Sequence, residues 1–177
     1  MYGVSSDTPY IFRSGILFIY ICLAVAAIIA IVDQVLKYLV VSNIGLGETL
    51  CAIPNILDLT YVKNTGVAFG MFKDLRFIFI ILTSVIVVVF IFLLFKMGNE
   101  SKLFAISSAL VIGGGIGNLI DRIFLGYVVD YLSLSFFSPI CNFADYCISA
   151  GTVLLVVYLL FFYDDKDKEN KSIKECK

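Results

Sequence analysis

Four long apolar blocks divide this chain, and they restrict its fold more than any other feature of the sequence. They cover residues 15–41, 77–95, 103–121 and 141–163. A helix needs about 20 apolar residues to cross a hydrocarbon core of about 30 Å, and each block approaches or exceeds that length. Continuous runs such as 77–82 lack the alternation of a membrane β-barrel strand. The sequence therefore predicts an all-α membrane protein with four transmembrane helices.

The lengths of the segments between the blocks leave room for one membrane-embedded domain, residues 13–163. Residues 1–12 form a polar N-terminal segment, and residues 164–177 form a charged tail. The largest piece outside the blocks is about 42–76. It contains several turn-forming residues and one stretch, 57–62, in which apolar and polar residues alternate. These features predict a small β-rich cap between the first and second helices.

Basic residues indicate which side of the membrane each segment occupies. Arg13 precedes the first block, Lys96 and Lys102 flank the link between the second and third, and lysines crowd the tail. Segments rich in Lys and Arg stay in the cytoplasm by the positive-inside rule. We therefore expect both termini in the cytoplasm and the β-rich cap on the extracytoplasmic side. The chain shows no basic patch broad enough to bind nucleic acid.

Carboxylates occur inside the apolar blocks or close to their ends, where charge is costly. A charged side chain at bilayer depth costs about 2.5–3.5 kcal/mol on insertion scales, so such groups are candidates for a functional site. The chain has no His, which removes the commonest general base and the commonest zinc ligand. Acid–base chemistry at neutral pH would then fall mainly to carboxylates, Lys, Tyr or Cys. We expect no metal or cofactor. The carboxylates concerned are Asp33, Asp58, Asp121, Asp130 and Asp145.

Asp33 and Lys37 are four residues apart in the first block, so they share one face of a helix and can form an ion pair. Two interpretations of this pair stay open. It either lowers the cost of burying both charges, or it organises a site or a substrate. In both cases this face points into the bundle or toward the membrane interface and away from lipid.

The third block combines small residues with a polar end. Glycines at both ends of the segment 113–117 are four residues apart, a spacing that lets membrane helices approach closely. Asn118, Asp121 and Arg122 follow at helical spacing. The guanidinium of Arg122 is expected to neutralise Asp121, or Asp130 beyond it, through a bidentate contact.

Asp130 and Asp145 are the candidate catalytic residues, because each lies among apolar neighbours. Burial raises the pKa of a carboxylate, and two carboxylates that share a site cannot both ionise. One acid and one base would result, as general acid–base hydrolysis requires. We expect Asn142 on the same helical face as Asp145, and Asn64 as an amide that orients a carboxylate. The two aspartates meet only if the third and fourth helices are adjacent and the segment between them folds back.

Three classes of function remain open on these residues alone. Buried carboxylates also relay protons in small proton-coupled transporters, and polar residues can simply hold helices together in an accessory subunit. The third class is a membrane protease. Cys51 and Cys141 fall on the same predicted side, so a disulfide between them is possible in an oxidising compartment.

The chain resembles the lipoprotein signal peptidase family, bacterial signal peptidase II, in several motifs that occur in the same order. The resemblance implies an aspartic endopeptidase of the bacterial inner membrane. Its substrates would be prolipoproteins modified with diacylglycerol, cut just before the lipidated cysteine near the outer face of the bilayer. The motifs are Asp33-Gln-x-x-Lys37, Asn55 through Asn64-Thr-Gly-Val-Ala-Phe-Gly70, Gly113-Gly-x-x-Gly-Asn118-x-x-Asp121-Arg122, Gly126-x-Val-Val-Asp130 and Asn142-x-Ala-Asp145.

The resemblance also assigns roles to individual positions. Asp130 and Asp145 match the catalytic pair, and we expect a monomer that contacts membrane lipid. The chain departs from the family pattern at Cys141, Tyr146 and Cys147, which affects the expected pocket wall and not the pair. The residues matching those that support the pair or bind substrate are Asp33, Lys37, Asn64, Asn118, Asp121, Arg122 and Asn142.

Overall fold

The structure, a computed structural model, describes residues 8–66, 75–99 and 101–163. The charged tail predicted at 164–177 and the first seven residues of the polar N-terminal segment lie outside this part of the chain. The described part contains four helices long and apolar enough to cross a membrane, as the apolar blocks predict. Its elements in order are α1 (Thr8–Asn43), β1 (Thr49–Ile53), β2 (Leu57–Asn64), α2 (Leu75–Met97), α3 (Lys102–Phe124), β3 (Val128–Leu134), β4 (Phe137–Cys141) and α4 (Phe143–Phe161).

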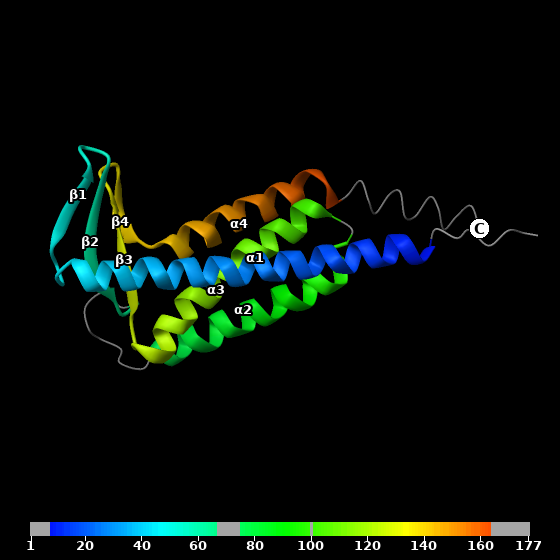
Figure 1. Cartoon of the computed structure of the whole chain (residues 1–177), viewed down its shortest axis with the longest axis horizontal. Coiled ribbons are helices and arrows are strands. Elements are labelled where there is room, and N and C mark those ends of the chain that lie inside the picture. The colour runs from blue at the N-terminus through cyan, green and yellow to red at the C-terminus, as the bar shows by residue number, and fades with distance from the viewer. Residues whose placement is uncertain (1–7, 67–74, 100, 164–177) are drawn as a thin grey trace, which may run out of the picture.

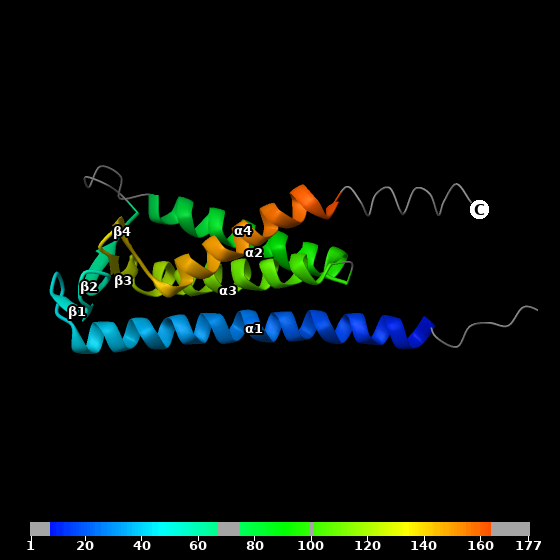
Figure 2. The same ribbon diagram turned by 90° about the horizontal axis from the view of Figure 1, so that it is seen from above.

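Helix α3 is the centre of the bundle and packs against the other three helices, with α1 on one side and α2 and α4 on the other (Figure 2). Its glycines make this possible. A Cβ atom on Gly113 would lie 2.7 Å from the Ala26 carbonyl oxygen of α1, and one on Gly114 would lie 2.5 Å from the Ala144 carbonyl oxygen of α4. The prediction that this glycine-rich segment admits a neighbouring helix is confirmed.

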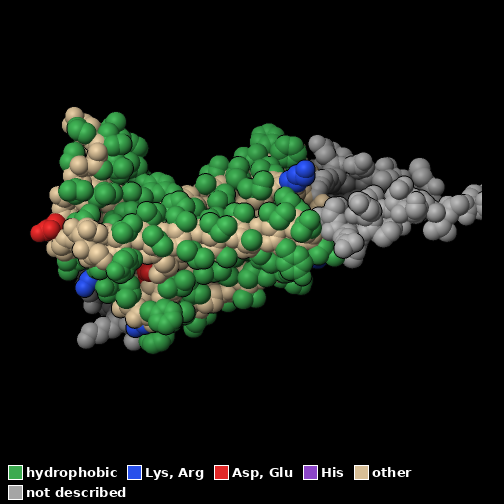
Figure 3. Space-filling view, viewed as in Figure 1, with side chains coloured by type: hydrophobic (Ala, Val, Ile, Leu, Met, Phe, Trp, Pro, Cys, Tyr) green, Lys and Arg blue, Asp and Glu red, His purple; other side chains and the backbone are tan. Residues whose placement is uncertain are grey.

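On the face seen in Figure 3, hydrophobic side chains cover most of the side of the bundle, whereas charged side chains lie toward its two ends. Exposed residues on this surface include Leu17, Ile31 and Phe77, each 62% exposed. Soluble monomers rarely expose a continuous apolar surface of this extent. Lipid covers such a surface when the helices span a bilayer, and the backbone polar groups are then satisfied within the helices.

A four-stranded antiparallel sheet lies at one end of the bundle (Figure 1), with the strand order β1-β2-β3-β4. The cap was expected from residues 42–76 alone, but two of its strands come from the segment between α3 and α4. Asp130 consequently lies on an inner strand, opposite Val62 of β2. Pro139 is tolerated in β4 because this is an edge strand. The fourth helix begins at Phe143, two residues later than predicted, because β4 runs to Cys141.

The order of strands in the sheet also determines whether Cys51 and Cys141 can form a disulfide. Cys51 lies on β1 and Cys141 on β4, which are the opposite edges of the sheet. Both are free thiols. The two cysteines therefore do not pair in this structure.

Candidate active site

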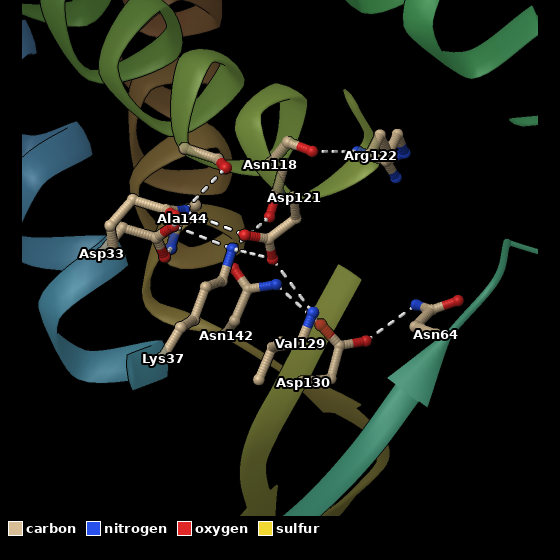
Figure 4. Close-up of polar contacts among 12 residues, drawn as sticks. Asp33, Lys37, Asn64, Asn118, Asp121, Arg122, Val129, Asp130, Asn142 and Ala144 are labelled. Atoms are coloured by element: carbon tan, nitrogen blue, oxygen red, sulfur yellow. Dashed lines mark hydrogen bonds and ion pairs between the residues drawn. The ribbon is translucent and has the colours of Figure 1, made fainter. Parts of the chain in front are cut away.

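Polar residues from α1, α3, α4 and the sheet converge where the bundle meets the sheet (Figure 4). Such burial is tolerated only when each group finds hydrogen-bond or charge partners. Six of the residues named from the sequence are almost completely buried, at 0–4% exposure: Asp33, Lys37, Asn118, Asp121, Asp130 and Asn142.

Asp130 lies on β3 between two side-chain amides. Its Oδ2 accepts a hydrogen bond of 2.7 Å from Asn64 Nδ2, and its Oδ1 accepts one of 2.6 Å from Asn142 Nδ2. The Asn64 amide is oriented in turn, because its Oδ1 accepts the Gly66 N–H at 2.8 Å. Burial raises the pKa of Asp130, and the nearby charge of Asp145 raises it further, while the two amide hydrogen bonds lower it. The net effect favours a protonated Asp130.

Asp145 lies in the first turn of α4 and is joined to Asn142 by a capping box. Asn142 Oδ1 accepts the Asp145 N–H at 3.0 Å, and Asp145 Oδ2 accepts the Asn142 N–H at 3.1 Å. Asn142 was expected beside Asp145 at helical spacing, and the two are in contact, but Asn142 caps the helix and does not lie within it. A helix N-terminus favours negative charge. Asp145 is half-buried, so it is also the more accessible carboxylate.

The two candidate aspartates therefore share one neighbour. Asn142 contacts Asp130 through its side chain and Asp145 through both its side chain and its backbone. Both conditions stated for their convergence are met, since α3 and α4 are adjacent and the segment between them returns as the β3–β4 hairpin.

A buried ammonium group organises the other side of Asp145. Lys37 Nζ lies 2.8 Å from Asp33 Oδ2 and 2.9 Å from Asp121 Oδ2. It also donates to Asn118 Oδ1 at 2.9 Å, while Asn118 Nδ2 donates to Asp145 Oδ1 at 2.7 Å. Because an ammonium group can only donate, Lys37 directs the Asn118 oxygen toward itself. The amide nitrogen of Asn118 consequently faces Asp145.

The carboxylates paired with Lys37 also hold the backbone next to each candidate aspartate. Asp33 Oδ1 accepts the N–H of Ala144, the residue before Asp145, at 3.1 Å. Asp121 Oδ2 accepts the Val129 N–H, directly before Asp130, at 3.0 Å. Of the two interpretations left open by the sequence, the organising one therefore has direct geometric support.

Arg122 was expected to pair with Asp121 or Asp130, but within the described residues it forms an ion pair with neither of them. In the described part of the chain, the ion pair partner of Asp121 is Lys37. Arg122 Nη1 instead donates to the Asn118 carbonyl oxygen at 3.2 Å, and the guanidinium carbon lies 5.5 Å from the centre of the Phe79 ring. Consecutive residues of a helix point in different directions, so Asp121 turns toward α1 while Arg122 turns toward α2.

Sequence reasoning missed two residues that support the site. Gln34 Nε2 donates to Asp121 Oδ1 at 2.9 Å, and its position directly after Asp33 in an apolar block was a usable signal. Arg76, at the start of α2, donates to the carbonyl oxygens of Arg122 and Ile123, both at 2.8 Å. These contacts satisfy the last carbonyl groups of α3, as basic side chains do at helix C-termini.

The arrangement can supply an acid and a base from two carboxylates in one partly enclosed place. Among residues 8–66, 75–99 and 101–163, no group of three or more His, Cys, Asp or Glu side chains is placed to hold a metal ion. The expectation that catalysis needs neither metal nor cofactor stays a prediction.

Comparisons with known proteins identify relatives over most of the chain. The family model described as "Signal peptidase (SPase) II" matches residues 25–161. The lipoprotein signal peptidase of Enterococcus faecalis (strain ATCC 700802 / V583) is 40% identical over 150 residues, which cover 84% of this chain and 92% of the relative. That of Halothermothrix orenii (strain H 168 / OCM 544 / DSM 9562) is 40% identical over 135 residues, covering 76% of this chain and 92% of the relative.

A solved structure supports the same relationship. It is described as "Bacterial membrane enzyme structure by the in meso method at 1.9 A resolution", and it superposes with a TM-score of 0.75 and 29% identity. The superposition covers 80% of this chain and 93% of the solved one. The arrangement of four helices and a terminal sheet is thus shared with an experimentally determined membrane enzyme.

Proposed function

The chain belongs to the signal peptidase II family, a family of proteases that remove signal peptides from prolipoproteins, and we propose that Asp130 and Asp145 are its catalytic pair. The observation that carries this proposal is the shared neighbour Asn142, which contacts both carboxylates. The transporter alternative is not favoured, because the matched family and the named relatives are signal peptidases.

The surroundings of the two carboxylates support different protonation states. Asp130 is 2% exposed, and burial raises its pKa, which favours the protonated form. Asp145 lies at a helix N-terminus and accepts hydrogen bonds from the Asn142 backbone and from Asn118. We therefore assign Asp130 as the acid and Asp145 as the base.

In the proposed reaction, a water molecule between the carboxylates attacks the scissile carbonyl carbon and gives a proton to Asp145. Asp130 hydrogen-bonds the carbonyl oxygen as the carbon becomes tetrahedral and negative charge develops on the oxygen. Collapse of the intermediate breaks the C–N bond, and the departing nitrogen takes a proton from the pair. Asn64, Asn118 and Asn142 hold the carboxylates in place while this happens.

The location of the site supports cleavage at a membrane surface. The sheet lies at one end of the bundle, while the link between α2 and α3, flanked by Lys96 and Lys102, lies at the other (Figure 1). Asp130 on β3 and Asp145 in the first turn of α4 belong to the end with the sheet. By the positive-inside rule this link is cytoplasmic. The site then faces the extracytoplasmic side of the bacterial inner membrane, and both termini are cytoplasmic. Diacylglyceryl groups on the precursor would anchor it in the same leaflet.

The test is a cleavage assay on the purified chain in detergent, with a diacylglyceryl-modified precursor and an otherwise identical unmodified one. Mass spectrometry of the products locates the cut. The proposal expects cleavage of the modified precursor directly before the lipidated cysteine, and little cleavage of the unmodified one. Equal cleavage of both precursors would contradict the lipid dependence, and intact precursors would contradict the proteolytic role.

A further inference from the structure

An apolar cavity of about 630 Å³ lies between the C-terminal end of α1 and the sheet. The α1 wall includes Leu36 and Val40, and the sheet contributes Leu59 and Leu132. A volume of this size falls in the range of about 300–1,000 Å³ that is typical of pockets for small molecules. None of the carboxylates described above lines this cavity, so it is distinct from the carboxylate site.

The cavity opens at the surface, beside the end of a helix that is long and apolar enough to span a membrane. Leu39 of α1 and Leu50 of β1 border it and are 49% and 56% exposed. Leu39 belongs to the apolar span Gly15–Asn43, and Asn43, the last residue of α1, also lines the cavity. The opening therefore lies at the end of the hydrocarbon layer, where it continues the apolar surface that lipid covers.

Water is a poor occupant of this space. At roughly 30 Å³ per molecule, about 20 waters would fill it, and each would need two to four polar partners. The lining has two residues with polar side chains. The Asn43 amide nitrogen already donates to the Leu39 carbonyl oxygen at 2.7 Å, and the Tyr131 hydroxyl, which has no hydrogen-bond partner among the described residues, is itself buried. An alkyl chain needs no such partner and buries its own surface together with that of the leucines.

A wall separates the cavity from the carboxylate pair. Tyr131 and Phe143 border the cavity, and each directly follows a residue of the site. Asp130 precedes Tyr131 on β3, and successive side chains of a strand point to opposite faces. Asn142, before Phe143, donates to Asp130. A lipidated residue next to the scissile bond would lie on the other side of this wall.

We infer that this cavity binds one acyl chain of a bilayer phospholipid. The chain would enter between α1 and β1 and pack against Tyr131 and Phe143, behind the strand and the helix cap that carry the carboxylate site. The inference goes beyond the peptidase activity, and its test does not require cleavage.

The experiment uses the absence of Trp from this chain, so that a single introduced Trp is the only one. Leu39→Trp places the probe at the mouth of the cavity. Val41→Trp is the matched control, because Val41 is on the same turn of α1, is 46% exposed and does not line the cavity. Each full-length variant, purified in detergent and stripped of lipid, is titrated with a phosphatidylglycerol whose acyl chains carry bromine, which quenches Trp fluorescence on contact.

The expected result is saturable quenching of Leu39→Trp at about one lipid per protein, with weak and unsaturated quenching of Val41→Trp. Adding Leu59→Phe, which fills the cavity, should abolish the saturable part, and Leu36→Phe serves the same purpose if that variant does not fold. Equal, unsaturated quenching at both positions would overturn the inference. So would displacement of the brominated lipid by a diacylated precursor but not by its unmodified counterpart, since the cavity would then hold the lipid of the substrate.

Discussion

The side-chain nitrogen of Asn142 donates a hydrogen bond of 2.6 Å to Asp130 Oδ1. The same residue caps α4, accepting the Asp145 N–H with its Oδ1 and donating its own N–H to the Asp145 carboxylate. A helix cap thus doubles as the link between two carboxylates from different elements. The stability of α4 and the geometry of the pair depend on one side chain, and substitutions can separate the two roles.

Asn142→Ser should separate capping from catalysis. Serine is as good an N-cap as asparagine, whereas alanine in its place costs about 1 kcal/mol. The serine hydroxyl is too short to reach Asp130. We expect Asn142→Ser to unfold close to the wild-type temperature and Asn142→Ala to unfold at a lower temperature. The rate of cleavage by both variants should fall about 10–100-fold, as it does when an orienting residue is lost. Full activity of the serine variant would show that the Asn142 contact with Asp130 is dispensable.

Lys37→Met should destabilise the protein strongly, because it leaves Asp33 and Asp121 buried without their cation. Removing one partner of a buried ion pair costs about 3–5 kcal/mol. The control is Lys37→Met combined with Asp33→Asn, which restores the net charge of the three-residue cluster. We expect this double variant to recover part of the loss in chemical denaturation. A double variant less stable than Lys37→Met would contradict the charge-balance explanation.

Gly117→Ala should be destabilising, although alanine is the better helix former. A Cβ atom at position 117 would lie 2.6 Å from Asp33 Oδ2, in the ion pair with Lys37. Overpacking of this kind costs about 1–3 kcal/mol. Gly115→Ala is the control in the same helix, because its Cβ would meet a methyl group of Val87, which can move. Thermal unfolding in detergent should rank Gly117→Ala below Gly115→Ala, and the opposite order would be inconsistent with this packing.

Much of the fold follows from residues whose behaviour is local. Long apolar blocks predict spanning helices because the bilayer imposes length, and glycines 113 and 117 predict a close helix contact because they lack side chains. The β3–β4 hairpin was not predicted. Residues Val128–Tyr131 of β3, which include Asp130, are all buried, so this part of the strand lacks the alternation of buried and exposed residues that would mark it in the sequence. Only its pairing with β2, distant in sequence, makes it a strand.

The site could be predicted as a set of residues, but few of its contacts could be. The ion pair between Asp33 and Lys37 was predicted from their spacing on one helix and is confirmed. Asp130, Asp145 and the three asparagines stood out as polar groups in apolar surroundings. The contacts of Lys37 with Asp121 and of Arg122 with its neighbours depend on how the helices turn toward each other, and periodicity within one helix does not determine that. Gln34 was overlooked for the same reason, because its role appears only when Asp121 of α3 lies beside it.

Asn64→Leu should shift the alkaline limb of the cleavage pH profile to higher pH. The Asn64 hydrogen bond stabilises the ionised form of Asp130 and so lowers its pKa. Without this bond the pKa rises, and if Asp130 is the acid, its active protonated form persists to higher pH. The measurement is kcat/KM against pH for the residual activity, with Thr65→Ala, an exposed neighbour, as the control. A limb displaced to lower pH would assign the proton to another group.

The most direct test of the proposed catalytic pair is the rate of cleavage of a diacylglyceryl-modified precursor by purified Asp130→Asn and Asp145→Asn. Asp58→Asn is the control, because Asp58 lies on β2 opposite Cys51, away from the bundle. Loss of acid–base catalysis lowers a reaction rate about 10²–10⁴-fold. The cleavage rate of both site variants should therefore fall at least a hundredfold, while the proteins remain folded and membrane-inserted. Asp58→Asn should cleave like the wild type. Cleavage near the wild-type rate by either site variant would contradict the assignment of that aspartate to the pair.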